Sequence, residues 1–419
     1  MTDQSLAARA LSRPEFIALC AALMALNALA IDVMLPALPY MGEALGVANE
    51  NERQFVVGAY MLGFGSAQLA FGPLTDRFGR RGPLLVGLGI YIACAFAATF
   101  APTFAILLAL RFTQGLGAAA TRVIATSVIR DRFSGREMAE VLSLVFMVFM
   151  AMPIVAPGIG QIILLTGPWH FIFLFMAGLS LAIAIWAYFR LPETLRPEYR
   201  RALTVKSVTD GFRIVLSNRM ALFYGLAGTF LFGAVFGFII CTQQIFAELY
   251  GLGPWFPVAF ACMAGVMAVS SFINSRVVRR FGMRRLSHGA LMVYLGMAVL
   301  WLVLSLNGPI PFWVFYAMLL VIQFVFGWAA SNMNALSMEP LGKVAGTAAS
   351  VFGFTQTVGG AVLGSIIGQQ FNGTLTPNAV GYVVMGTLVL GCVLIAENGK
   401  LFGVGKEYQK PSPASAAAE

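Results

Sequence analysis

Three charged side chains lie inside long apolar runs of this sequence, and they are the residues whose chemistry stands out. Asp32 belongs to the first apolar run, and Arg111 and Arg122 share a later one. A charge in the hydrocarbon core of a membrane is costly, so it is a functional candidate by default. A carboxylate in a low-dielectric environment holds a proton more tightly than in water, which makes Asp32 a candidate proton carrier.

The two arginines have one functional and one ordinary interpretation each. They share one face of a helix to within about 20°. Arg111 would favour the ionised form of a nearby acid, or it would donate hydrogen bonds to exposed backbone carbonyls. Arg122 either extends a positive stripe into a cavity, favouring neutral or anionic ligands over cations, or snorkels to the membrane surface. The sequence leaves both choices open.

The elements that position these charges are membrane spans. Of 419 residues, 59% are hydrophobic and 11% charged, whereas a soluble domain carries about 25% charged residues. This composition excludes a soluble enzyme, a disordered protein and a disulfide scaffold. Twelve apolar runs have the roughly 20 residues that a spanning helix needs, and they predict an all-α membrane protein: 16–39, 54–75, 83–101, 103–128, 140–165, 168–190, 220–247, 254–275, 287–306, 310–335, 346–370 and 378–397.

The basic residues predict the orientation. With the N-terminus in the cytoplasm, all but Arg53, Arg111 and Arg122 of the 27 Lys and Arg residues fall in inner loops or tails. Lys and Arg favour cytoplasmic loops, so both termini are expected there. The net charge of +9 is then a topology signal, not a nucleic-acid surface. The expected organisation is a six-helix half (1–190), a cytoplasmic linker (191–219), a second six-helix half (220–397) and a cytoplasmic tail (398–419).

An internal repeat and a signature loop point to a family. Arg77-Phe78-Gly79 is echoed by Arg280-Phe281-Gly282, and Gln114-Gly115 by Phe326-Gly327. Residues 72–83, GPLTDRFGRRGP, resemble the signature loop G-x-x-x-D-R-x-G-R-R of the major facilitator superfamily. The resemblance covers about 16–397. It implies twelve helices in two halves that rock around a substrate site near the membrane midplane.

The resemblance assigns this loop a conformational role. Its residues would latch the cytoplasmic side shut, with Asp76 meeting the start of the eleventh span near Gly346 and Thr347; the latch residues are Gly72, Asp76, Arg77, Gly79, Arg80 and Arg81. In the second half Arg279 stands at the position of Asp76. A symmetric second latch is therefore not expected.

Three further motifs narrow the resemblance to one branch. Residues 30–39, AIDVMLPALP, resemble the first helix of the Bcr/CflA (bicyclomycin/chloramphenicol resistance-like) drug:proton antiporters, in which the matching Asp serves proton coupling and substrate recognition. Residues 111–119, RFTQGLGAA, resemble the fourth-helix motif whose Arg is implicated in proton transfer. Residues 156–160, APGIG, match the fifth-helix antiporter motif in part and favour efflux. Pro157, Gly158 and Gly160 would form a rocking hinge, with a static packing kink as the alternative.

A substrate cavity of this class is expected to be apolar with a few polar anchors. Its candidate residues share a place inside the predicted spans, and they are Met24, Asn27, Asp32, Tyr60, Met61, Gln68, Arg122, Met147, Phe236, Gln243, Gln323, Asn332 and Gln356. Each polar member has the alternative role of joining two helices by a hydrogen bond.

These features predict a monomeric, proton-coupled antiporter of the bacterial inner membrane that exports small amphiphilic drugs or metabolites. Its partners would be a small-molecule substrate, protons and the lipid bilayer, without nucleic acid, and the proton gradient would replace any cofactor. The five Cys and two His residues show no metal or disulfide spacing, and no cluster with catalytic spacing predicts an enzyme. A metabolite or sugar transporter of the same fold and a non-transporting membrane receptor remain as alternatives.

Overall fold

A computed structural model describes residues 11–133, 135–195, 209 and 213–403. These residues form helices and loops without any strand, and 12 helices are long and apolar enough to cross a membrane. The prediction of an all-α protein with twelve spans is confirmed.

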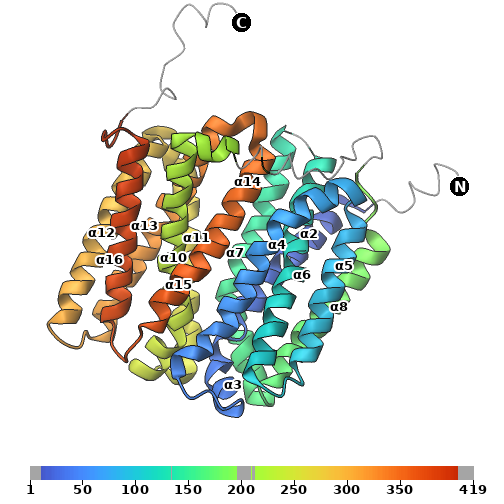
Figure 1. The fold of residues 1–419 in the computed structure, drawn as a ribbon, viewed down its shortest axis with the longest axis horizontal. Helices are drawn as coiled ribbons and strands as arrows, with labels where there is room; N and C mark the ends of the chain where they lie inside the picture. Colours follow the sequence, from blue (N-terminus) through green and yellow to red (C-terminus); the bar gives the residue numbers. More distant parts are fainter. Residues whose placement is uncertain (1–10, 134, 196–208, 210–212, 404–419) are drawn as a thin grey trace, which may run out of the picture.

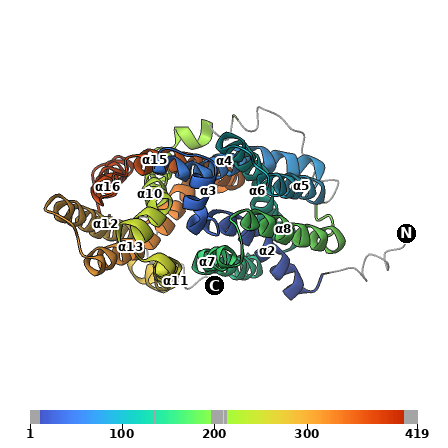
Figure 2. The ribbon, with the colours of Figure 1, turned by 90° about the horizontal axis from the view of Figure 1, so that it is seen from below.

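The helices form two groups that lie side by side (Figures 1 and 2). The N-terminal half contains α2 (Arg13–Asp32), α3 (Leu38–Ala44), α4 (Phe55–Phe78), α5 (Arg81–Ala98), α6 (Phe104–Arg132), α7 (Gly135–Thr166) and α8 (His170–Arg190). The C-terminal half contains α10 (Arg219–Gln243), α11 (Phe256–Phe281), α12 (Met283–Leu306), α13 (Phe312–Met338), α14 (Ala345–Phe354), α15 (Gly360–Gln369) and α16 (Thr376–Ala396).

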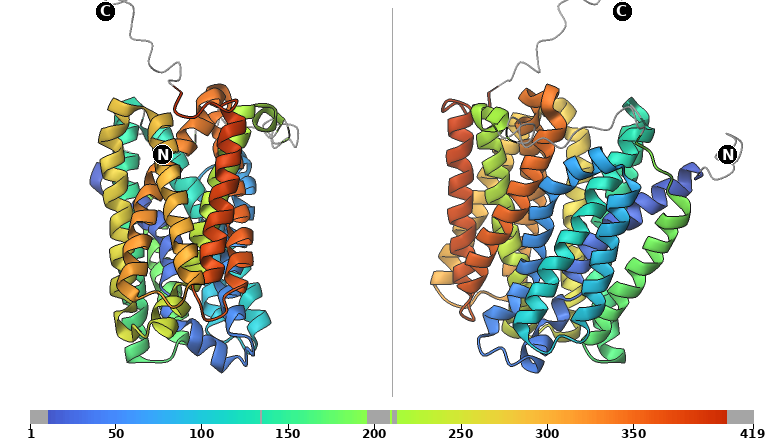
Figure 3. Two further views of the ribbon diagram at one scale, coloured as in Figure 1. Left: turned by 90° about the vertical axis from the view of Figure 1, so that its left-hand side faces the viewer. Right: turned by 45° about the vertical axis from the view of Figure 1, so that its right-hand side comes forward.

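The bundle has two distinct ends. Helix α2 begins and α16 ends at the same end, which is uppermost in Figures 1 and 3 and is called the N/C end below. Helix α3 lies at the opposite, distal end. Each charged residue of interest is placed relative to these two ends.

The first span is interrupted where its charge lies. The sequence predicts one continuous run over 16–39, but α2 ends at Asp32 and a 3-10 turn, Leu35–Ala37, precedes α3. Pro36 has no N–H to donate to the carbonyl of Asp32, so the α-helical ladder stops there. The predicted continuous helix is therefore wrong at its distal end, and Asp32 sits at a helix terminus.

The eleventh span is also less regular than predicted. Over 346–370 the chain forms α14, a π-helical turn (Thr355–Gly359) and α15. The turn packs against α10, where an added Cβ at Gly359 would lie 2.5 Å from a methyl carbon of Thr229. Short π-helical segments are frequent at functional sites, and this one lies where α10 meets the eleventh span.

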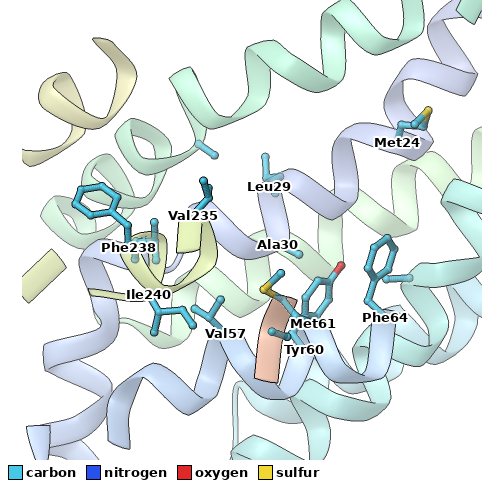
Figure 4. Close-up of a cluster of buried hydrophobic side chains, with 14 of the residues drawn as sticks. Met24, Leu29, Ala30, Val57, Tyr60, Met61, Phe64, Val235, Phe238 and Ile240 are labelled. Carbon is cyan, nitrogen blue, oxygen red and sulfur yellow. The ribbon is translucent and has the colours of Figure 1, made fainter. Parts of the chain in front are cut away.

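An apolar cluster joins the two halves. Figure 4 shows Val57 and Met61 of α4 beside Val235, Phe238 and Ile240 of α10. All five side chains are buried. This contact holds the helices that surround Asp32 and Arg111 against the C-terminal half.

Candidate functional site

Asp32 is a buried acid deep in the bundle. Its exposed fraction is 4%, and within the described part of the chain its carboxylate has no hydrogen bond or ion pair. In the spans that the structure describes, every other Asp or Glu lies within three residues of a span end. Asp32 is thus placed to exchange a proton or a ligand without first breaking an ion pair.

Arg111 is fully buried on α6 and bonded to its surroundings. It donates to the carbonyl oxygens of Ala30 at 2.9 Å and Val56 at 3.3 Å, and to Oε1 of Gln114 at 2.7 Å. Its guanidinium carbon lies 4.5 Å from the ring centroid of Tyr60. Backbone carbonyls therefore satisfy hydrogen-bond donors of this buried arginine. Arg111 does not pair with Asp32 but binds the backbone two residues before it.

Asn27 and Tyr60, two predicted cavity residues, belong to the same cluster. Asn27 donates to Oγ1 of Thr121 at 2.9 Å, and the Tyr60 hydroxyl donates to Oδ1 of Asn27 at 3.4 Å. These bonds tie α2, α4 and α6 together around Arg111. In this structure both side chains connect helices, the alternative role expected for polar residues of this kind.

Arg122 lies on the same face of α6, nearer the N/C end. It is half-buried, and its guanidinium carbon lies 5.9 Å from the ring centroid of Phe64. Within the described residues its guanidinium has no acidic partner. Of the two arginines in the span, Arg122 is the one whose charge is available.

The other predicted cavity residues are spread over several interfaces. Met24 and Met61 are both buried, and Met61 lies beside Tyr60 (Figure 4). Gln68 donates to Thr357 across the two halves at 3.4 Å. Phe236 packs against α15, and Gln356 lies against Gly228 of α10.

The remaining candidates lie in three different places. Asn332 donates to Asn274 at 2.9 Å, and Gln323 contacts the sulfur of Met267 at 3.9 Å, so both join α13 to α11. Gln243 is buried at the distal end of α10, whereas Met147 is 63% exposed on α7. The structure does not gather these residues around Asp32.

The signature loop forms a charge network at the N/C end. Arg80 pairs with Asp76 at 2.7 Å and with Asp131 of α6 at 2.9 Å. Glu193 accepts from the backbone N–H groups of Arg80 at 2.8 Å and Arg81 at 3.2 Å, which caps the start of α5. Burial disfavours the charge of Arg80, but the hydrogen bonds that Arg80 donates to Asp131 and Asp76 outweigh it and raise the pKa of Arg80.

Other residues of the loop have individual roles. Gly79 has φ +92°, and an added Cβ would lie 2.4 Å from the Glu193 carboxylate, so glycine is required there. Arg81 donates to the Tyr188 carbonyl at 2.5 Å, and Arg77 lies over the Phe78 ring. An added Cβ at Gly72 would lie 3.7 Å from Ser350 of α14.

The expected contact between Asp76 and the eleventh span falls partly on side chains that the structure does not describe. Gly346 and Thr347 lie outside the described side chains, so the latch stays a prediction. The sequence reasoning missed Asp131 and Glu193. Their signal was their position, because each is an acid directly at or after the end of a span.

The C-terminal half has its own charge network in the related place. Arg284 pairs with Glu397 at 2.8 Å and with Glu339 at 3.6 Å, and the Tyr224 hydroxyl donates to Glu397 at 2.8 Å. Arg279 stands at the Asp76 position, as the sequence shows, but Arg284 replaces Arg80 as the centre. These three bonds lie within the C-terminal half.

The predicted hinge lies in a continuous helix. Helix α7 runs from Gly135 to Thr166 with Pro153 and Pro157 inside it. An added Cβ at Gly160 would lie 2.0 Å from the carbonyl oxygen of Val33, whereas Gly158 has open space around it. Gly160 therefore lets α7 approach the chain directly after Asp32, and a hinge at Pro157 stays a prediction.

A polar cluster that the sequence reasoning missed joins the halves at the distal end. Asn51 donates to the Phe371 carbonyl at 2.7 Å and accepts from Gln244 at 2.9 Å, and Gln54 donates to Gln244 at 2.5 Å. Arg53 pairs with Glu248 at 3.3 Å. We call the five side chains of Asn51, Arg53, Gln54, Gln244 and Glu248 the distal gate. They close the distal side, whereas at the N/C end the ion pairs of Arg80 with Asp76 and Asp131, and those of Arg284 with Glu339 and Glu397, each lie within one half.

Comparisons with known proteins give the family. The model of the Major Facilitator Superfamily matches residues 20–365. The chain is 30% identical to the bicyclomycin resistance protein homolog of Haemophilus influenzae over 83% of this chain and 87% of that protein. It is 28% identical to the multidrug resistance protein MdtL of Escherichia coli O127:H6 over 84% of this chain and 89% of that protein.

The solved structures agree on the fold. The crystal structure of a D-xylose-proton symporter matches with a TM-score of 0.68 at 13% identity, covering 93% of this chain and 100% of that one. A likeness at this identity concerns the fold alone. The family match, the curated relatives, the twelve spans and the signature loop show that the chain belongs to the major facilitator superfamily, in the Bcr/CflA branch, and is a multi-pass transporter of the bacterial inner membrane.

Proposed function

We propose that the chain is a proton-coupled antiporter that exports small amphiphilic drugs. The observation that carries the proposal is Asp32, a buried acid at a helix terminus with no partner among the described residues. Such a carboxylate can hold a proton or a substrate group, but not both at once. Competition between the two for one site is what couples their opposite movements. The names of the bicyclomycin resistance homolog and of MdtL support a drug as the substrate.

Arg111 acts as a positioning residue in this proposal. Through the Ala30 carbonyl it fixes the last turn of α2 against α6, and so it holds the backbone that carries Asp32. Arg111 contacts the backbone of α2 and not the Asp32 carboxylate. Protonation of Asp32 therefore changes the charge of the site while Arg111 stays in place.

The orientation follows from the charges at the helix ends. Arg80, Arg132, Arg190 and Arg284 lie at the N/C end, while Arg53 lies at the distal end. Because Lys and Arg favour cytoplasmic loops, we assign the N/C end to the cytoplasm. The distal gate is then the periplasmic gate, and it is closed in this structure.

The transport cycle requires this gate to open and close. With the distal gate closed, a drug enters from the cytoplasmic side and binds near ionised Asp32. Rocking of the halves breaks the bonds of Asn51, Gln54 and Gln244, and a periplasmic proton then displaces the drug. In this proposal a monomer carries out the cycle, driven by the proton gradient across the membrane. The cycle makes or breaks no covalent bond, so it involves no enzymatic step or cofactor.

The test is Asp32→Asn in inverted membrane vesicles. Respiration acidifies the vesicle interior, and an antiported drug releases protons that a pH-sensitive acridine dye reports. The wild type is expected to give a drug-induced signal within a panel of amphiphiles, and Asp32→Asn is expected to give none. Glu43→Gln, which removes an exposed acid on α3, should behave as the wild type. Normal coupled transport by Asp32→Asn would overturn the proposal.

A further inference from the structure

We infer that Arg122 is the second anchor of the drug site, and that it selects amphiphiles with a hydrogen-bond acceptor or anionic group at the end remote from Asp32. This inference rests on the proposed function and adds the chemical class of its substrate. It starts from the direction in which the Arg122 side chain points.

Arg122 points into the bundle and not toward the nearer membrane surface. An added Cβ at Gly115 would lie 2.1 Å from the carbonyl oxygen of Tyr60 and 2.7 Å from the backbone nitrogen of Phe64, so these parts of α4 and α6 are level. Arg122 is seven residues further along α6, roughly 10 Å closer to the N/C end. Its guanidinium nevertheless lies 5.9 Å from the Phe64 ring. The side chain therefore extends back toward the middle of the bundle, which is the opposite of snorkelling.

The charge of Arg122 is also uncompensated. Arg111 gives its three nitrogens to carbonyl and amide oxygens. Among the described residues, Arg122 has the Phe64 ring as its one charge partner, and no carboxylate faces it. A cation–π contact of this length is worth about 0.5–2 kcal/mol, far less than the cost of an unpaired charge at membrane depth. A guanidinium in this position favours a ligand that brings an oxygen acceptor.

Arg122 and the backbone next to Asp32 lie at different levels along the bundle. Arg111, which binds the backbone next to Asp32, reaches the Val56 carbonyl of α4. Phe64, beside Arg122, is eight residues further along α4, or roughly 12 Å along the helix axis. Between these two levels α4 carries Tyr60 and Met61, which are both buried (Figure 4).

This separation defines a two-ended ligand. A hydroxyl or amide N–H at one end would donate to ionised Asp32, and protonation of Asp32 would displace it, as antiport requires. A carboxamide, nitro or carboxylate oxygen at the other end would accept from Arg122. The apolar body would lie along Tyr60 and Met61.

The test uses three probes with one 4′-hydroxybiphenyl body. They end in a carboxamide, a carboxylate and a trimethylammonium group, and their counterflow is measured in proteoliposomes. The wild type is expected to transport the first two at least tenfold faster than the cation. Arg122→Gln should reduce this preference to less than threefold, mainly by raising KM for the two acceptor probes. Arg122→Lys, which keeps the charge, should keep the preference for the carboxylate.

A matched control is available in the C-terminal half. Arg276 lies over the Phe272 ring at 4.6 Å, but it is exposed near the end of α11. Arg276→Gln therefore removes the same type of contact away from the site and should leave selectivity unchanged. Thermal unfolding in detergent checks that each variant is folded.

Several outcomes would overturn the inference. They are a wild-type preference for the cation, failure of the wild type to transport any of the three probes, or unchanged selectivity in folded Arg122→Gln. Proton coupling is read separately with the pH-sensitive dye. Loss of coupling with intact selectivity would overturn the proposed function alone, and intact coupling with a cation preference would overturn the role of Arg122 alone.

Discussion

The cores of the two halves occupy related positions but differ in charge. The offset that relates Gly115 to Gly327 also relates Arg111 to Gln323. Arg111 is fully buried and donates to three oxygens. Gln323 is equally buried, but among the described residues Nε2 contacts only the Met267 sulfur and Oε1 has no hydrogen bond.

The surroundings of Arg111 and Gln323 also differ in charge. Arg111 is enclosed by the backbone of α2 and α4 next to an acid. The C-terminal core is a set of packed rings, in which the ring centroid of Tyr382 lies 5.7 Å from that of Tyr294, in a stacked pair, and 5.2 Å from that of Trp301, in a tilted pair. In the proposed function the N-terminal half therefore carries the charge that changes during transport, and the C-terminal half packs aromatic rings in the related place.

The largest expected difference between the two cores comes from replacing their central residues by Met. Arg111→Met leaves the carbonyls of Ala30 and Val56 without their donor and removes the link that holds Asp32. We expect it to lower the free energy of unfolding by about 2–5 kcal/mol and to abolish proton-coupled transport. Gln323→Met should change stability by less than about 1 kcal/mol and keep transport, because Gln323 makes few bonds.

Denaturant unfolding in detergent and the vesicle assay measure both variants. The contrast between the cores is refuted if Gln323→Met costs as much as Arg111→Met. It is also refuted if Arg111→Met transports normally.

A smaller difference is expected at the related glycines. Gly115→Ala would place a methyl group 2.1 Å from the Tyr60 carbonyl oxygen, so α4 and α6 must separate. Gly327→Ala would meet the Ser270 hydroxyl at 2.6 Å, and a side chain can rotate away. We expect a loss of about 2–3 kcal/mol for Gly115→Ala and less than about 1 kcal/mol for Gly327→Ala. Equal losses in thermal unfolding would show that the two packing sites are equivalent.

The smallest difference in stability is expected between variants of the two charge networks at the N/C end. Arg80 lies 2.9 Å from Asp131, and Arg284 lies 2.8 Å from Glu397. Each arginine has a second, more exposed acid near it, and the side-chain exposures match closely. Arg80→Gln and Arg284→Gln should therefore each lower the free energy of unfolding by about 1–3 kcal/mol. If Arg284→Gln left the free energy of unfolding unchanged while Arg80→Gln lowered it, only the network of the signature loop would be stabilising.

Much of the fold could be predicted from patterns along the linear sequence. Run lengths predicted the twelve spans, because a membrane imposes a minimum helix length and leaves few alternatives. The break after Asp32 was missed although Pro36 was visible, since proline often bends a span without ending it. The π-helical turn at Thr355–Gly359 had no sequence signal, because it depends on the packing of the eleventh span against α10.

The candidate site could be predicted from the sequence only in part. Asp32 and Arg111 stood out because charges inside apolar runs are rare. Their contacts did not, since a hydrogen bond from Arg111 to a backbone carbonyl leaves no mark in side-chain identity. The distal gate was missed because Asn51, Gln54 and Gln244 are ordinary polar residues at span ends, and only their meeting across the halves makes them a gate.

The sequence by itself determined the membrane class, the twelve spans, the family and the few charges that lie in the spans, because composition, length and local motifs are properties of the linear chain. The tertiary structure decided what those charges contact. It placed Arg111 on backbone carbonyls next to Asp32, pointed Arg122 into the bundle beside Phe64 and closed the distal gate. The physical reason is that partners for a buried charge come from other helices, whose relative positions depend on packing and cannot be obtained from spacing along one helix.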